Sequence, residues 1–179
     1  MCVSTQRIFV HAEIQAEFVD LFAARVGALR VGDPLSIETE VGPLIHPREA
    51  DRVASWIEEA TAGGGCIVVG GERLSATTLR PTVLLQPPAS SKVSREEVFG
   101  PLTCIYGFTK LDQAIEVANG LPVAFQASIF TPAIGPALRA AERLDASAVM
   151  LLRFRTAYHP PPICRIFPAK PRKRRSTWE

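Results

Sequence analysis

The chain has 179 residues, of which 47% are hydrophobic and 21% are charged, and its formal net charge is +2. This composition is typical of a folded globular domain and argues against an intrinsically disordered chain. No apolar run approaches the ~20 residues of a membrane-spanning helix, and no secretory signal pattern begins the chain. The four cysteines have neither CxxC pairing nor metal-ligand spacing with the histidines, so we expect free thiols in a reducing cytoplasm and no metal site. Cys66 and Cys104 lie in short apolar segments, where we expect buried packing residues.

The positive charge is concentrated at the C-terminal end. Residues 155–179 contain seven of the 20 Lys and Arg residues, five of the 15 prolines and a single acid, Glu179. We therefore predict a folded, mildly acidic region over 1–153 and an irregular tail over 154–179. The basic run from Lys170 to Arg175 also resembles a nuclear-targeting or nucleic-acid-binding patch. No aromatic residues are interleaved with this run and no nucleic-acid motif accompanies it, so we favour a solvated tail and consider nucleic acid an unfavoured partner.

Short apolar segments alternate with amphipathic segments up to residue 153. Apolar residues with a 3.6-residue period predict helices, and short apolar runs between turn residues predict strands. In chain order we predict a strand over 4–10, helices over 12–30 and 47–62, strands over 66–69, 81–86 and 103–108, a helix over 111–119, a strand over 126–131, a helix over 132–144 and a strand over 147–152. This alternation predicts an α/β fold with a mostly parallel sheet flanked by helices.

A segment near the N-terminus resembles the one that carries the nucleophilic cysteine in aldehyde dehydrogenases. It reads Cys2-Val3-Ser4-Thr5-Gln6-Arg7-Ile8-Phe9-Val10-His11. In that family a Gly-Gln-x-Cys stretch leads into a strand with an Arg-Ile-x-Val core. The Gly-Gln pair is absent here because the chain starts at Met1, so we expect an N-terminally truncated form. The resemblance implies that Cys2 is the catalytic nucleophile. Arg7, on the strand that follows, could tune Cys2 through its charge, but we favour a structural ion pair.

A second motif, 95 residues after Cys2, reads Glu96-Glu97-Val98-Phe99-Gly100-Pro101. It resembles the Glu-x-Phe-Gly-Pro motif of the same family. The resemblance implies that Glu97 accepts hydrogen bonds from the nicotinamide ribose hydroxyls and that Phe99 packs beside the nicotinamide. A structural alternative stays open, because Ser94-x-x-Glu97 also fits a helix capping box.

Weaker landmarks extend the resemblance from residue 2 to about residue 150. They are Gly32-Asp33-Pro34, Val41-Gly42-Pro43-Leu44-Ile45, Gly70-Gly71, Pro81-Thr82-Val83-Leu84, Ala118-Asn119 and Gln126-Ala127-Ser128-Ile129-Phe130-Thr131. Where the family usually has Tyr-Gly-Leu, this chain has Val123-Ala124-Phe125. After Met150 the family's Asn and its Pro-Phe-Gly-Gly stretch are replaced by a divergent sequence. We interpret that change as a shifted reading frame.

The resemblance implies an oxidoreductase that converts an aldehyde to a carboxylic acid with NAD or NADP. A cysteine thiolate forms a thiohemiacetal, hydride passes to the nicotinamide, and water releases the acid from a thioester. In the family the general-base glutamate, the oxyanion asparagine and most of the cofactor domain precede the cysteine. We therefore expect an inactive fragment, with a subunit completed by a separate cofactor-domain chain and a basic-tailed binding module as alternatives. The implied partners are a small-molecule aldehyde and, as in the parent family, further copies of the chain, with no membrane.

Overall fold

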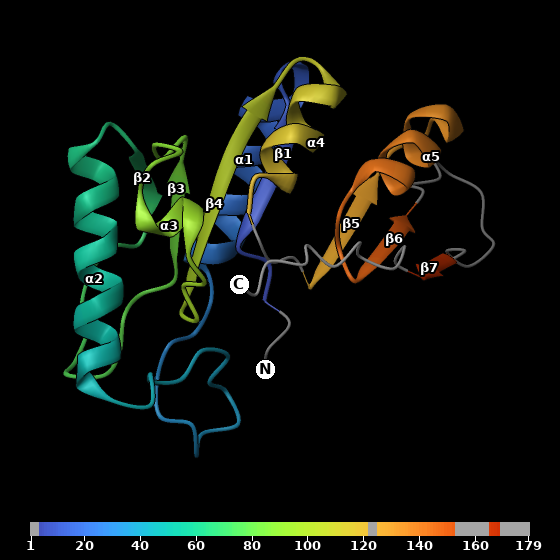
Figure 1. Cartoon of the computed structure of the whole chain (residues 1–179). Coiled ribbons are helices and arrows are strands. Elements are labelled where there is room, and N and C mark those ends of the chain that lie inside the picture. Colours follow the sequence, from blue (N-terminus) through green and yellow to red (C-terminus); the bar gives the residue numbers. More distant parts are fainter. Residues whose placement is uncertain (1–3, 122–124, 153–164, 169–179) are drawn as a thin grey trace, which may run out of the picture. The chain divides into compact units, whose positions relative to one another are not determined.

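The computed structural model describes residues 4–121, 125–152 and 165–168. It divides the chain into two compact units, Met1–Thr109 and Lys110–Glu179, which we describe separately. Figure 1 shows the strands and helices of each unit in chain order. The predicted boundary between a catalytic-domain region and a tail at residue 153 remains a proposal, because residues 153–164 and 169–179 lie outside the described part. Val123, Ala124 and the basic run from Lys170 to Arg175 also lie outside the described residues, so what the sequence predicts for them stays a prediction.

The first unit is built on a four-stranded sheet with the order β1-β4-β3-β2. Strand β4 lies between β1 and β3 and is parallel to both, whereas β2 pairs antiparallel with β3 at the sheet edge. The strands are β1 Arg7–His11, β2 Cys66–Val69, β3 Thr82–Leu85 and β4 Leu102–Phe108. The predicted mostly parallel arrangement is therefore confirmed, with one antiparallel edge strand.

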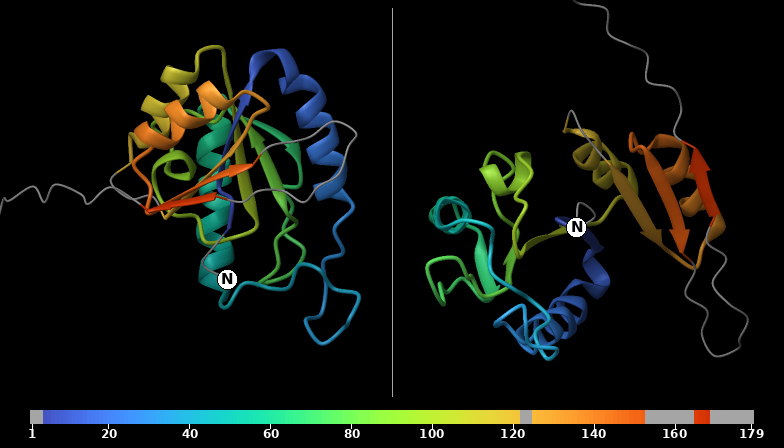
Figure 2. Two further views of the ribbon diagram at one scale, coloured as in Figure 1. Left: turned by 90° about the vertical axis from the view of Figure 1, so that its right-hand side faces the viewer. Right: turned by 90° about the horizontal axis from the view of Figure 1, so that it is seen from below.

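Helices cover both faces of this sheet. Successive residues of the central strands point to opposite faces, so each central strand contributes to an apolar cluster on either side. Val83 and Ile105 pack in one apolar cluster with Val10 and with Val19 of α1 (Ala12–Gly27). Leu84, which follows Val83 in β3, and Cys104, which precedes Ile105 in β4, belong to a second cluster. There they pack with residues of α2 (Pro47–Ala62) and of the short α3 (Lys92–Arg95): Ala50, Val53, Trp56, Ile57, Ala60 and Val93. Figure 2 shows α1 and α2 on opposite sides of the sheet.

Helix α2 begins and ends where its sequence provides caps. The His46 ring accepts a hydrogen bond from the Arg48 N–H at 3.2 Å, and Pro47 occupies the first helical turn, where a missing N–H costs nothing. The backbone N–H of Gly63 returns to the Glu59 carbonyl at 3.1 Å. The sequence places His46 in a loop before Pro47; the structure shows that this loop residue is also the helix cap.

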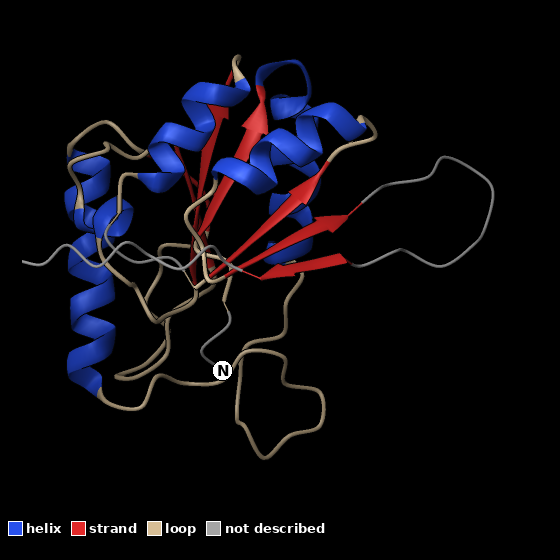
Figure 3. Ribbon diagram, turned by 45° about the vertical axis from the view of Figure 1, so that its right-hand side comes forward, coloured by secondary structure: helices blue, strands red, loops and turns tan. Residues whose placement is uncertain are grey.

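The second unit contains α4 (Leu111–Asn119), β5 (Gln126–Phe130), α5 (Ile134–Arg143), β6 (Ala148–Leu152) and β7 (Arg165–Pro168). Its sheet has the order β5-β6-β7, with β5 parallel and β7 antiparallel to β6. Asn119 joins α4 to the end of α5, because its Nδ2 donates to the Arg143 carbonyl at 2.8 Å. Figure 3 shows helices beside the strands of each unit. None of the helices in the described ranges has the length and hydropathy needed to cross a bilayer.

Three elements differ from the sequence prediction. The short helix α3 was not among the predicted elements. Helix α1 ends at Gly27, not Arg30, because Ala28 caps it and Val31 then forms a β-bridge with Val41. Strand β7 lies within the stretch that composition predicts as irregular. Its pairing with β6 is a long-range interaction that a Pro-rich and basic local sequence does not reveal.

Candidate active site

The segment that follows Cys2 runs beside the start of β4. Cys2 itself lies outside the described residues, so its predicted proximity to Glu97 and Phe99 remains a proposal. From Ser4 onward the chain is described, and Thr103 donates its hydroxyl hydrogen to the Thr5 carbonyl with the oxygens 3.0 Å apart. The Cys104 N–H donates to the Gln6 carbonyl at 2.8 Å, directly before the parallel pairing of β1 with β4. The backbone four residues after Cys2 is thus fixed to the sheet.

The side chain of Gln6 reaches across to the segment that contains the second motif. Its amide nitrogen donates to the Glu96 carbonyl at 2.6 Å and to the Val93 carbonyl at 3.1 Å. Its amide oxygen accepts the Val98 N–H at 3.1 Å. One half-buried side chain therefore supplies both donors and an acceptor to three backbone groups of residues 93–98.

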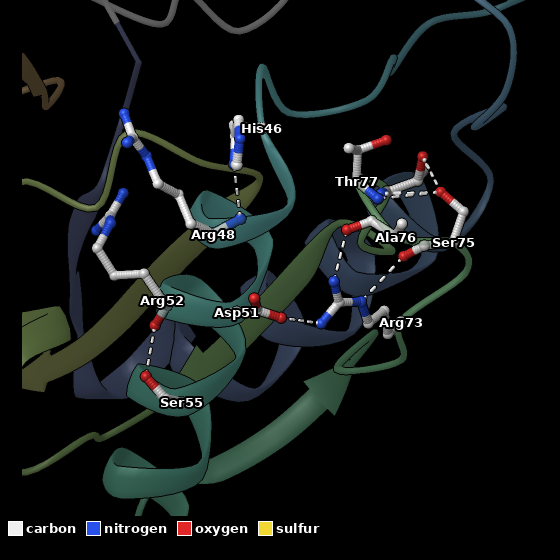
Figure 4. Close-up of polar contacts among 10 residues, drawn as sticks. His46, Arg48, Asp51, Arg52, Ser55, Arg73, Ser75, Ala76 and Thr77 are labelled. Carbon is white, nitrogen blue, oxygen red and sulfur yellow. Dashed lines mark hydrogen bonds and ion pairs between the residues drawn. The ribbon is translucent and has the colours of Figure 1, made fainter.

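Arg52 of α2 binds the same segment at the Val98 carbonyl. Its Nη2 donates to the Val98 carbonyl at 2.7 Å, and its Nε donates to the Glu49 carboxylate at 2.9 Å. The guanidinium also lies 4.6 Å from the centroid of the Trp56 ring, a cation–π distance. Hydrogen bonds from Arg52 lead the causes that lower the pKa of Glu49 below its ordinary value. Figure 4 shows Arg48 and Arg52 extending from one side of α2, away from Asp51.

Asp51 instead pairs with Arg73, which holds the loop between β2 and β3. The Arg73 Nε donates to the Ser75 carbonyl at 3.0 Å, and its Nη2 donates to the Ala76 carbonyl at 2.5 Å (Figure 4). Arg52 and Arg73 therefore use the same chemistry, a carboxylate of α2 plus backbone carbonyls, on two different segments. Only Arg52 acts on the segment with the second motif.

Glu97 and Phe99 are displayed outward from this anchored segment. The intervening Val98 side chain is 1% exposed, whereas the Glu97 side chain is exposed and Phe99 is 63% exposed. Within the described residues, no hydrogen bond or ion pair occupies the Glu97 carboxylate. An unoccupied carboxylate and an open ring are the groups that a ribose diol and a flat aromatic ring would contact. These residues therefore fit the nicotinamide end of a cofactor.

Phe99 has a positive φ of 48°, which is uncommon for a large side chain. The chain on either side is fixed, because Val98 is held as above and the Leu102 N–H donates to the Gly100 carbonyl at 2.8 Å. Gly100 also lies close to α2, since an added Cβ would be 3.0 Å from Cγ2 of Val53, which is tighter than most Cβ contacts. Strained backbone of this kind persists where the surroundings hold it on both sides.

The structure does not support the helix-cap alternative for Glu97. Helix α3 begins at Lys92 with Ser91 as its N-cap and ends at Arg95, so Glu97 lies beyond it. Ser94 is inside the helix and shares a 2.7 Å hydrogen bond with the Tyr106 hydroxyl. The Ser94-x-x-Glu97 spacing therefore has no capping role.

The other cysteines were both expected to be buried packing residues, and this is wrong for one of them. Cys104 is buried, and that burial raises the pKa of its thiol to about 11. Cys66 is exposed because it begins β2, the strand at the sheet edge. Arg7 was weighed as a group that tunes Cys2 or forms an ion pair. It lies 5.8 Å from the Phe9 ring centroid, and burial lowers its pKa.

Sequence reasoning missed Gln6 and Arg52. Gln6 appears in the first motif only as a residue between the nucleophile and the strand, and an uncharged amide gives no signal of a contact 92 residues away. Arg52 is three residues after Glu49, which predicts an ordinary surface pair on a helix. The contact of Arg52 with the Val98 carbonyl depends on how α2 packs and cannot be inferred from spacing.

Comparison with known proteins places the chain in a family. Residues 1–163 match the aldehyde dehydrogenase family, which extends past the last motif recognised in the sequence. A 3-sulfolactaldehyde dehydrogenase of Priestia aryabhattai is 36% identical over 151 residues, which cover 84% of this chain and 31% of the relative. Succinate-semialdehyde dehydrogenase (NADP(+)) 1 of Mycobacterium tuberculosis strain H37Rv is 38% identical over 132 residues, covering 73% of this chain and 29% of the relative.

Comparison with solved structures points to the same family. Aldehyde dehydrogenase 21 from Physcomitrella patens, in complex with succinate, superposes with a TM-score of 0.81 at 31% identity over 84% of this chain and 31% of that chain. Betaine aldehyde dehydrogenase from Staphylococcus aureus, in complex with NAD+, gives 0.79 at 29% identity over 88% of this chain and 33% of that chain. The chain thus spans about a third of the length of these relatives. On this evidence the chain belongs to the aldehyde dehydrogenase family.

Proposed function

We propose that this chain contributes the nucleophile and the nicotinamide contacts for oxidation of an aldehyde to a carboxylic acid. Cys2 is the nucleophile, and Glu97 and Phe99 contact the cofactor, NAD or NADP. The observation that supports this assignment best is the hydrogen bonding of Gln6. It joins the segment just after Cys2 to the exposed Glu97–Phe99 segment, although the two are far apart in sequence.

The protein's own part in the chemistry begins with the Cys2 thiol. As a thiolate it attacks the aldehyde carbon and forms a carbon–sulfur bond, and the carbonyl oxygen becomes the thiohemiacetal oxygen. NAD(P)+, when bound, would accept the hydride that leaves the thiohemiacetal carbon, and loss of the hydroxyl proton then leaves a thioester on Cys2. Glu97 would accept hydrogen bonds from the ribose hydroxyls, and the Phe99 ring would pack beside the cofactor ring and exclude water from it. Water then cleaves the Cys2 thioester, which releases the acid and restores the thiol.

We infer that turnover needs more polypeptide than these 179 residues. Relatives are about three times as long, and the cofactor's pyrophosphate and adenosine ordinarily bind through backbone N–H groups of a nucleotide-binding domain. Glu97 and Phe99 contact only the other end of the dinucleotide. We therefore expect no turnover from these 179 residues alone. The alternative, a subunit completed by a separate cofactor-domain chain, predicts that activity appears when the two are mixed.

A graft tests the assignment. Residues 2–150 would replace the matching part of the Priestia 3-sulfolactaldehyde dehydrogenase, and formation of reduced cofactor would be followed with that enzyme's aldehyde. We expect Cys2→Ala to lower the rate by about a thousandfold or more. Cys66→Ala is the matched control, because Cys66 is exposed and outside the site, and it should retain activity. An active graft whose Cys2→Ala variant keeps its rate would refute the proposal.

A further inference from the structure

The peptide groups on both sides of Val98 are held by side chains and not by secondary structure. Its N–H is bound by Gln6 Oε1 at 3.1 Å, and its carbonyl by Arg52 Nη2 at 2.7 Å. These two side chains come from different elements of the first unit: Gln6 lies directly before β1, and Arg52 lies in α2. No strand or helix imposes this conformation on residues 96–101, since α3 ends at Arg95 and β4 begins at Leu102.

The hydrogen bonds of Gln6 and Arg52 to Val98 matter because Val98 lies between Glu97 and Phe99. Glu97 and Phe99 flank it and are exposed, and Phe99 has the positive φ of 48°. A residue in that conformation costs free energy, so a freely moving segment would leave it. With the Val98 peptides fixed, the backbone positions from which the Glu97 and Phe99 side chains extend are fixed with them.

We propose that Gln6 and Arg52 are positioning residues for the nicotinamide contacts, an inference that rests on the proposed function of Glu97 and Phe99. Gln6 has the larger role. Its side chain fixes the Glu96 and Val98 backbone while its own carbonyl is fixed to Cys104, so the segment after Cys2 and the segment with Glu97 move as one body. The described segment that follows Cys2 is thereby joined to the segment of the cofactor contacts by a single amide group.

Gln6 and Arg52 bind different backbone atoms, so substitutions can test the contribution of each side chain separately. Gln6→Met removes all three hydrogen bonds at similar side-chain length. Gln6→Glu keeps an acceptor for the Val98 N–H, but it places a carboxylate against the Glu96 and Val93 carbonyls. Arg52→Met removes the bond to the Val98 carbonyl. Gln15→Met on α1 and Arg73→Met are the matched controls, because neither residue bonds to residues 93–99.

The test measures amide hydrogen exchange by NMR in the full chain, together with a titration with nicotinamide mononucleotide, the half of the cofactor that Glu97 and Phe99 would contact. For Gln6→Met we expect exchange at Val98 to accelerate about tenfold or more and the affinity for the nucleotide to fall about tenfold. Exchange at Ile105, in the centre of β4, should not change. Arg52→Met should weaken nucleotide binding without exposing the Val98 N–H, and Gln6→Glu should retain part of the Val98 protection.

Three outcomes would overturn the inference. They are parent-like exchange at Val98 in Gln6→Met, nucleotide affinity that survives the loss of Val98 protection, and equal acceleration at Val98 and Ile105, which would mean a general loss of stability. Failure of the proposed function looks different. In that case the parent chain shows no nucleotide-dependent shifts at Glu97 and Phe99, while the exchange at Val98 still responds to Gln6→Met.

Discussion

The amide oxygen of Gln6 accepts the backbone N–H of Val98 at 3.1 Å, across 92 residues of sequence. The two motifs that resemble aldehyde dehydrogenases lie on either side of this bond. One motif supplies the proposed nucleophile, four residues before Gln6, and the other supplies the proposed cofactor contacts next to Val98. The structure thus joins two motifs that the sequence connects only through family resemblance.

The positive φ of Phe99 predicts an unusual pattern of stability among its variants. Phe99→Gly should be more stable than Phe99→Ala by about 1 kcal/mol, because glycine adopts a positive φ without the clash of a Cβ. The ring itself is 63% exposed, so its removal costs little packing. Urea unfolding of both variants checks this expectation. Equal midpoints, or a less stable glycine variant, would show that the backbone at Phe99 is not strained.

Burial of Cys104 predicts a loss of stability in alkali. Desolvation raises the pKa of the folded thiol to about 11 from an ordinary value of 9.0, so the folded chain holds this proton more tightly than the unfolded chain. The resulting stabilisation is complete below pH 9.0 and is lost as the pH rises toward about 11, by an amount on the order of 2 kcal/mol. Burial also raises the pKa of Tyr106, which acts in the same direction at still higher pH.

Urea unfolding at a series of pH values, with Cys104→Ala beside the parent, measures this contribution. The parent should lose stability across that interval, and Cys104→Ala should lose less. As an independent check of burial, a thiol reagent at neutral pH should modify Cys66 and leave Cys104 unmodified in the folded chain. Parallel pH curves for the two proteins would contradict the assignment.

The loop between α1 and α2 exposes apolar side chains on a fixed backbone. Leu35 and Ile37 are 93% and 96% exposed, while Arg30 holds the base of the loop through its Nε bond to the Glu38 carbonyl at 2.5 Å. Apolar groups presented in this way attract hydrophobic probes. We expect the chain to bind a hydrophobic dye, and the double variant Leu35→Ser, Ile37→Ser to bind less. Leu138→Ser is the control, since Leu138 lies in the second unit. Dye binding equal to the parent's in the double variant would count against this surface.

Periodicity and turn residues were sufficient to predict the alternation of helices and strands. The five buried residues of α2, for example, recur at helical spacing, and His46, Pro47 and Gly63 mark its ends. The order in which the strands pair in the sheet could not be predicted in this way. The position of β1 beside β4, and not beside β3, depends on which helix crosses which face, which local sequence does not encode.

The candidate site was predicted only as far as family motifs reach. Glu97 and Phe99 were named from a motif, and the exposed positions of both residues agree with a contact role without testing it. Gln6 and Arg52 were not predicted because their function lies in long-range bonds to backbone groups, which every residue possesses and no sequence pattern distinguishes. The burial of Cys66 was predicted wrongly because a strand of four apolar residues has the same sequence pattern at the edge of a sheet as at its centre.

The most direct test of the account is formation of NADH or NADPH by the isolated 179-residue chain with a panel of aldehydes, beside its Cys2→Ala variant. Hydride transfer requires the nicotinamide ring in contact with the carbon bonded to Cys2, and such proximity contributes about 7–11 kcal/mol in favourable cases. The cofactor would be held at one end only by Glu97 and Phe99, so it would rarely reach that position. The account predicts no reduced cofactor above the Cys2→Ala level. Cys2-dependent turnover by the chain alone would contradict it and would show that these residues form a complete enzyme.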